Sequence, residues 1–109
     1  MENVIEIVSF KVLSEASESA LLEATHESQG FVEQLQGFQY RSLSYNNDTH
    51  TWTDVVYWDS MSDALSAGEK FMDSPQCQPL MALIDIETVN IQRQVIKMCK
   101  LADRYATPA

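Results

Sequence analysis

The order in which strand-like and helix-like segments follow one another is the feature that most constrains the fold of this chain. Short runs rich in β-branched and aromatic residues, which are typical of strands, occupy residues 4–13, 38–45, 51–59 and 88–98. Apolar residues at helical spacing fill the gap after the first run and the gap after the third. The order strand, helix, strand, strand, helix, strand predicts an α+β, ferredoxin-like domain with both helices on one side of a four-stranded antiparallel sheet.

Cap and turn residues indicate where these elements begin and end. Ser14 is expected to cap the first helix and Gly37 to follow its last turn as the C′ residue. The run NNDTH between the second and third strands is turn chemistry and predicts a hairpin. Ser60, three residues before Asp63, resembles a capping box at the start of the second helix, and Pro75 interrupts that helix before the last strand.

Length and charge limit the classes of partner. A chain of 109 residues supports a single core, so we expect one domain over residues 1–100 and a C-terminal tail over residues 101–109. The net charge of −9 argues against nucleic acid and anionic membranes, because both require a basic face. The start of the chain lacks the features of a signal peptide, and no apolar run approaches a membrane span of about 20 residues. Cys77 and Cys99 are not spaced like metal ligands, so we expect two reduced thiols. Together with the lack of a signal peptide or membrane span, this predicts a cytoplasmic protein.

The first and third strands carry apolar residues on both faces. In the third strand Val55 and Tyr57 point to one face, while Val56 and Trp58 point to the other. The predicted fold has helices for only one face, and a large exposed apolar face marks an interaction surface. A second copy of the chain is the simplest partner, so we expect a homodimer formed by contact between the two sheets.

The run YWDSMSDALSAGEKFMDSP (57–75), preceded by Gly37-Phe38 after the first helix, resembles the dimeric α+β barrel superfamily. Within it, the sequence is similar to the antibiotic-biosynthesis-monooxygenase-like domains, in which a strand ends in a tryptophan followed by a polar turn and a helix. The resemblance covers residues 4–98. It implies two ferredoxin-like protomers that form an α+β barrel, each with a pocket between its sheet and its helices. Members include cofactor-independent oxygenases of polycyclic aromatics, haem-degrading enzymes and many proteins without an assigned role.

Two departures from the resemblance argue against haem degradation. Haem-degrading relatives carry their haem-ligating histidine at the position of Gly68, and glycine cannot bind iron. Their first strand also supplies an asparagine, which the segment EIVSF (6–10) lacks. We therefore expect no cofactor, and we expect no metal because no residues have metal-ligand spacing.

Gly68 lies within the apolar stripe of the second helix, where glycine costs about 1 kcal/mol relative to alanine. One interpretation is close packing, in which the helix needs no side chain where it crosses Trp58. The other is that the missing side chain leaves space for a small molecule. On the second interpretation, the pocket is lined by Val56, Trp58, Leu65, Gly68, Phe71 and Met72.

Asp54 shares a strand face with Trp58 and is a candidate general base near this pocket. The alternative is an ion pair with Arg93 or Arg41, and Glu6 has the same two interpretations. We favour structural pairing, because buried charges usually occur paired.

Three functions are compatible with these observations. The sequence favours a homodimer that binds a small apolar molecule, either an aromatic compound or an acyl chain. The alternative is a cofactor-independent monooxygenase of an aromatic, polyketide-like substrate, which needs a base and a donor for the developing oxyanion in the pocket. Asp54 and His26 are its candidate catalytic residues, although His26 lies off the main stripe of the first helix. A dimeric scaffold without a ligand is the third.

Overall fold

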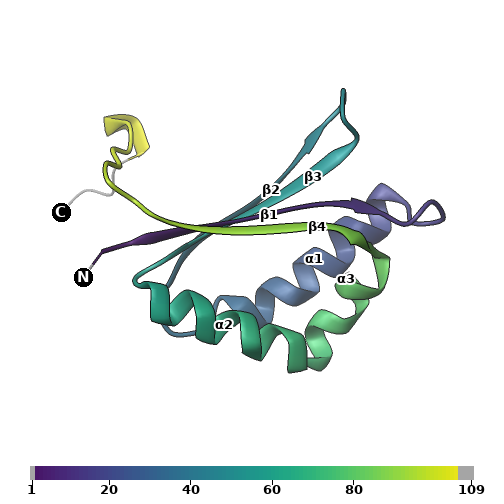
Figure 1. Ribbon diagram of the computed structural model, residues 1–109, viewed down its shortest axis with the longest axis horizontal. Coiled ribbons are helices and arrows are strands. Elements are labelled where there is room, and N and C mark those ends of the chain that lie inside the picture. Colours follow the sequence, from purple (N-terminus) through teal and green to yellow (C-terminus); the bar gives the residue numbers. More distant parts are fainter. Residues whose placement is uncertain (1, 106–109) are drawn as a thin grey trace.

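The computed structural model describes residues 2–105 and arranges them as a sheet with helices packed on one of its faces (Figure 1). The four strands pair in the order β2-β3-β1-β4, and each neighbouring pair is antiparallel. The predicted α+β, ferredoxin-like topology is therefore confirmed. In chain order, the elements are β1 (Val4–Val12), α1 (Glu18–Val32), β2 (Phe38–Asn46), β3 (Thr51–Trp58), α2 (Met61–Asp73), the 3-10 turn η1 (Pro75–Cys77), α3 (Gln78–Leu83), β4 (Ile84–Val95) and the 3-10 turn η2 (Asp103–Tyr105).

The first helix differs from its prediction at both ends. Its N-cap is Ser17, whose hydroxyl accepts the Ala20 N–H at 3.1 Å, and not Ser14. Ser14 lies in a turn closed by a backbone hydrogen bond between Ala16 and Leu13, so the chain cannot start a helix there. The helix ends at Val32, so Gly37 is not its C′ residue. Gly37 instead adopts a φ of 84° in the turn before β2, a conformation that favours glycine.

The second half of the chain matches its predicted turns but not its last strand. Ser60 accepts the Asp63 N–H at 3.1 Å and begins α2 as predicted, and Pro75 follows its end. The last strand begins at Ile84, before the predicted position 88, and ends at Val95 instead of position 98. The first residues of β4 pair with β1 on the far side of a register shift, which lies between Ser9 and Lys11 of β1. A register shift interrupts the alternation of inward-facing and outward-facing residues, so the sequence there lacks the pattern of a regular strand.

The two faces of the sheet are buried to different extents. Along β3 burial alternates strictly, and Trp52, Asp54, Val56 and Trp58 face the helices. Two apolar clusters form the core beneath this face, one around Trp58 and one around Leu21. The outer face carries Ile5, Ile7, Val55 and Tyr57, all partly exposed, and no helix of residues 2–105 covers it (Figure 1).

The C-terminal part of the chain leaves the sheet after β4 and ends, within the described residues, in η2 (Figure 1). The predicted tail covers residues 101–109, of which 106–109 lie outside the described residues. Cys77 is buried in η1 and Cys99 is exposed, and both are free. None of the described helices has the length and apolar character needed to cross a membrane.

Candidate functional site

A cavity of about 640 Å³ lies on the helix-facing side of the sheet. All four strands contribute to its wall, together with the end of α1, α2 and α3. Exposed apolar side chains from α2 and from β4 belong to this wall, which indicates that the cavity opens between these two elements. The structure places every residue predicted to line a pocket on this wall: Val56, Trp58, Leu65, Gly68, Phe71 and Met72.

Gly68 faces an arginine and not the tryptophan that the packing interpretation required. A Cβ atom built at Gly68 would lie 3.1 Å from Nη2 of Arg93 and would meet no other atom within 4 Å outside its own helix turn and neighbours. Trp58 is therefore not the close neighbour of this glycine, so packing against Trp58 does not explain it. The missing side chain makes room in the cavity wall for the guanidinium of Arg93.

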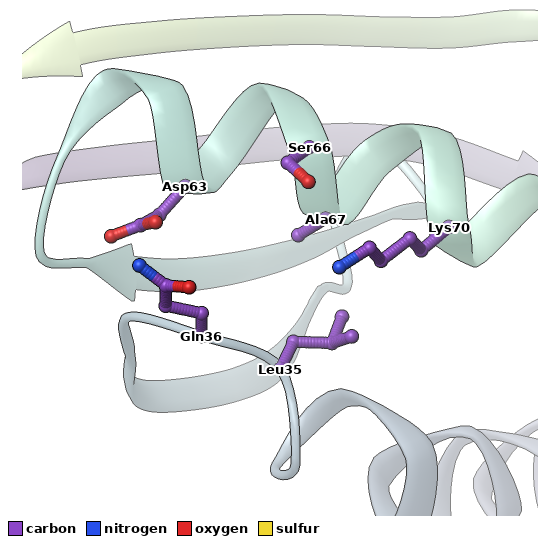
Figure 2. Close-up of a pocket in the computed structure, with 6 residues that line it drawn as sticks. All are labelled: Leu35, Gln36, Asp63, Ser66, Ala67 and Lys70. Carbon is purple, nitrogen blue, oxygen red and sulfur yellow. The ribbon is translucent and has the colours of Figure 1, made fainter.

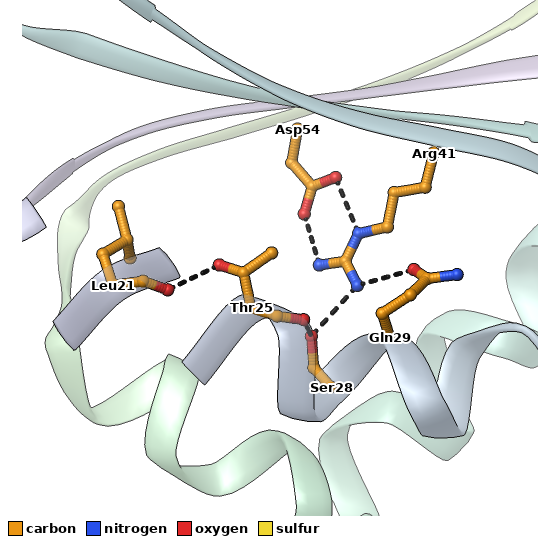
Figure 3. Close-up of polar contacts among 6 residues, drawn as sticks. All are labelled: Leu21, Thr25, Ser28, Gln29, Arg41 and Asp54. Atoms are coloured by element: carbon orange, nitrogen blue, oxygen red, sulfur yellow. Dashed lines mark hydrogen bonds and ion pairs between the residues drawn. The ribbon is translucent and has the colours of Figure 1, made fainter. Parts of the chain in front are cut away.

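Asp54 is held by an arginine whose three side-chain nitrogens all donate hydrogen bonds. Arg41 binds the carboxylate through two hydrogen bonds, Nε to Oδ1 at 3.0 Å and Nη2 to Oδ2 at 2.7 Å (Figure 3). Its Nη1 donates to Ser28 Oγ at 3.0 Å and to Gln29 Oε1 at 3.2 Å, so the arginine ties β2 and β3 to α1. Of the two arginines predicted as partners of Asp54, Arg41 is the one that forms the ion pair. This bidentate pairing leaves the carboxylate poorly suited to act as a base.

Glu6 forms the second ion pair of the cavity wall. Arg93 lies directly opposite on β4, and its Nε donates to Glu6 Oε2 at 2.7 Å. The Arg93 side chain is 25% exposed, whereas that of Arg41 is 6% exposed. The preference for structural pairing over free carboxylates therefore holds for both acids.

Trp58 is buried and its indole Nε1–H has no hydrogen-bond partner among the described residues. Its ring packs edge-on against Phe38, with centroids 5.9 Å apart. A buried donor without a partner costs about 1–3 kcal/mol. Although the Trp58 ring belongs to the cavity wall, this nitrogen is buried and is not exposed to the cavity.

The remaining candidates lie outside the cavity. His26 is exposed on α1 and does not line the cavity. Burial raises the pKa of the Cys77 thiol, although a hydrogen bond with Ser74 lowers it, so the thiolate is disfavoured. Cys77 does not line the cavity either. Within residues 2–105, no group of three or more acidic, histidine or cysteine side chains could hold a metal ion.

A second, smaller cleft of about 40 Å³ lies where α2 meets the turn after α1. Figure 2 shows Leu35 and Gln36 on the turn side and the α2 residues opposite them. This volume admits about a water molecule and not a ligand. The larger cavity is therefore the candidate site.

Sequence reasoning missed the part of the wall that α3 and the start of β4 provide. Leu80 comes from α3, while Ile84 and Ile86 come from the segment of β4 that the prediction left out of the strand. The apolar run PLMALIDI (79–86) was the available signal, but its spacing does not separate a helix from a strand.

Comparison with known proteins gives a consistent structural result. No protein-family model matches this sequence, and a comparison with curated proteins finds no relative. Among solved structures, SnoaB, a cofactor-independent oxygenase from Streptomyces nogalater, has a TM-score of 0.69 at 15% identity, over 91% of this chain and 97% of that one. A monooxygenase from the gene ActVA-Orf6 of Streptomyces coelicolor, solved with nanaomycin D, has a TM-score of 0.71 at 17% identity, over 94% of each chain. A protein of unknown function from Nitrosomonas europaea has a TM-score of 0.66 at 14% identity, over 94% of this chain and 96% of that one.

At these identities, structural similarity establishes a shared fold and does not transfer an activity. The resemblance that the sequence motif indicated is confirmed at this level. The chain has the ferredoxin-like fold of the antibiotic-biosynthesis-monooxygenase-like proteins.

Proposed function

We propose that this protein is a homodimer that binds a small, largely apolar molecule in the cavity between its sheet and α2. The ligand is an aromatic compound or an acyl chain, held by the wall residues Val56, Trp58, Leu65, Gly68, Phe71 and Met72. The proposal requires no cofactor, and it uses the ring of Trp58 as an apolar platform.

The observation that carries the proposal is the cavity itself. Its volume of about 640 Å³ is in the range of small-molecule sites. Its wall is mostly apolar, with a few polar groups at fixed positions, which is the usual composition of such sites.

Titration with N-phenylnaphthylamine, a neutral fluorophore that brightens in apolar surroundings, tests the proposal. We expect saturable binding at one site per chain. Gly68→Leu places a branched side chain in the cavity and should weaken binding by about tenfold or more, which corresponds to about 1.4 kcal/mol. Ser66→Leu adds the same side chain to the same helix at an exposed position that does not line the cavity, and it should leave binding unchanged.

The proposal fails if wild-type protein shows no saturable binding of the fluorophore. It also fails if Gly68→Leu and Ser66→Leu bind the fluorophore equally, because the occupied surface would then lie elsewhere. Circular dichroism of each variant checks that the fold is retained.

The homodimer is supported by the open face of the sheet. Ile5, Ile7, Val55 and Tyr57 are partly exposed there, and residues 2–105 supply no second layer to cover them. Apolar residues at adjacent positions of neighbouring strands form a continuous patch, which is typical of protein interfaces. A two-fold contact between two copies would bury this patch against itself.

A cofactor-independent monooxygenase is the alternative, and the structural similarity to SnoaB and to the ActVA-Orf6 monooxygenase favours it. The geometry of the cavity supports it less. Asp54 and Glu6 are both paired with arginines, and His26 lies outside the wall. Oxygen uptake with a polyphenolic aromatic compound separates the two functions. Uptake that Trp58→Phe abolishes would favour the enzyme, and binding without uptake would favour the carrier.

A further inference from the structure

Arg93 has hydrogen-bonding capacity that the protein does not use. A guanidinium carries donors on Nε and on both terminal nitrogens. Within residues 2–105, the only side-chain hydrogen bond of Arg93 runs from Nε to Glu6, whereas all three side-chain nitrogens of Arg41 have partners. The terminal nitrogens of Arg93 are therefore available, and the side chain belongs to the cavity wall.

The packing around Arg93 keeps these nitrogens available. Glu6 holds the guanidinium by its Nε, which fixes the direction of the side chain. On the other side, Gly68 presents no side chain to Nη2, which lies 3.1 Å from where a Cβ would stand. A larger residue at position 68 would press on the terminal nitrogens, so the glycine on α2 and the glutamate on β1 together place the donors in the cavity.

The charges of the wall determine which ligand atom fits these donors. Arg41 and Asp54 neutralise each other, as do Arg93 and Glu6, so neither pair leaves a net charge. The fifth charged residue of the wall, the exposed Glu69, adds one negative charge. The free positions on Arg93 are N–H groups and have no acceptor capacity. They match an acceptor oxygen on the ligand, and they do not match a ligand amine.

We propose that the terminal nitrogens of Arg93, exposed by Gly68 and oriented by Glu6, bind an acceptor oxygen at one end of an otherwise apolar ligand. This inference rests on the proposed function and adds the chemical class of the ligand, an aromatic or aliphatic ketone or carboxylate. The apolar body occupies the wall formed by Val56, Phe71 and Met72, while the oxygen lies at the Arg93 side of the cavity.

A set of matched ligands isolates the contribution of the ligand's oxygen to the binding affinity. Acetylnaphthalene and ethylnaphthalene differ by a carbonyl in place of a methylene, and naphthoate presents the same ring with an anionic oxygen. Their affinities are measured by displacement of N-phenylnaphthylamine. The quantity compared is the ratio of the acetyl affinity to the ethyl affinity, because a ratio taken within one protein cancels the general change in the cavity.

Three variants test the role of Arg93. Arg93→Met keeps the apolar stem and removes the donors, and it should lower the acetyl-to-ethyl ratio by about tenfold, because a hydrogen bond to a charged group is lost. The double variant Glu6→Gln with Arg93→Met should show the same loss without leaving a buried carboxylate unpaired, so it covers the case in which the single variant does not fold. Glu6→Gln alone keeps the donors of Arg93 and should keep most of the ratio.

The outcomes separate this inference from the proposed function. If ethylnaphthalene binds equally to wild type and to the double variant, and the ratio is also unchanged, the cavity binds ligands but Arg93 does not anchor them. If the fluorophore binds but no naphthalene displaces it, this inference falls while the proposed function stands. If the fluorophore itself does not bind, both proposals fall. A ratio that drops supports the inference, and a larger drop for naphthoate than for acetylnaphthalene identifies the oxygen as anionic.

Discussion

The two faces of the sheet differ in how the chain covers them. The helix-facing side carries both buried ion pairs and leaves a cavity of about 640 Å³ between the layers. The outer face carries Ile5, Ile7, Val55 and Tyr57 on its two central strands, all partly exposed, and the described residues place nothing over it. A face that the chain covers incompletely has room for a small molecule, while a face without a second layer is available to a second protein. The comparison therefore separates the ligand site from the proposed subunit interface.

The largest effect is expected on the outer face. Val55→Glu would place a charge from each copy in the centre of the proposed interface, where burying an unpaired charge costs several kcal/mol. We expect wild type to sediment as a dimer at micromolar concentration. The variant should lose dimer affinity by about a hundredfold or more and sediment as a monomer.

Gln34→Glu adds the same charge per chain at an exposed position after α1 and should remain dimeric. The interface is located wrongly if Val55→Glu stays dimeric. If the wild-type protein sediments as a monomer, the proposed homodimer is wrong.

The sequence predicted which face of a strand or helix each residue occupies better than it predicted which side chains contact one another. The two-residue period of β3 and the helical period of α2 assign each residue to a face, so spacing put Val56, Trp58 and Leu65 on the side between sheet and helix. The pocket on that side was implied by the family resemblance, and these residues do line the cavity. The contact between Gly68 and Arg93 could not be predicted in this way, because it depends on how α2 lies over β4. Likewise, the sequence left Arg41 and Arg93 as equal partners for Asp54, because that choice depends on strand order and register.

A smaller effect is expected on the helix-facing side, at Gly68. Gly68→Ala gains up to about 1 kcal/mol of helix propensity. Its methyl group would press only on Nη2 of Arg93, the far end of a flexible side chain that can move by a few tenths of an ångström. We expect the free energy of unfolding to stay equal or to rise by about 1 kcal/mol, measured by urea denaturation.

A clear loss of stability in Gly68→Ala would show that Arg93 cannot yield and that the wall is tightly packed at this point. Overpacking of that kind typically costs about 1–3 kcal/mol. Ala67 on the same helix is already buried, so the propensity of α2 itself is not in question.

The central claim is that a ligand fills the cavity beside Trp58, and the indole N–H of this residue reports on it most directly. The protein has two tryptophans, of which Trp58 lines the cavity and Trp52 does not. In a proton–nitrogen correlation spectrum, with the two indole signals assigned through Trp58→Phe, we expect saturating acetylnaphthalene to shift the Trp58 signal strongly and the Trp52 signal little. A bound ligand that leaves the Trp58 signal unmoved, or that shifts the Trp52 signal more, would contradict the account.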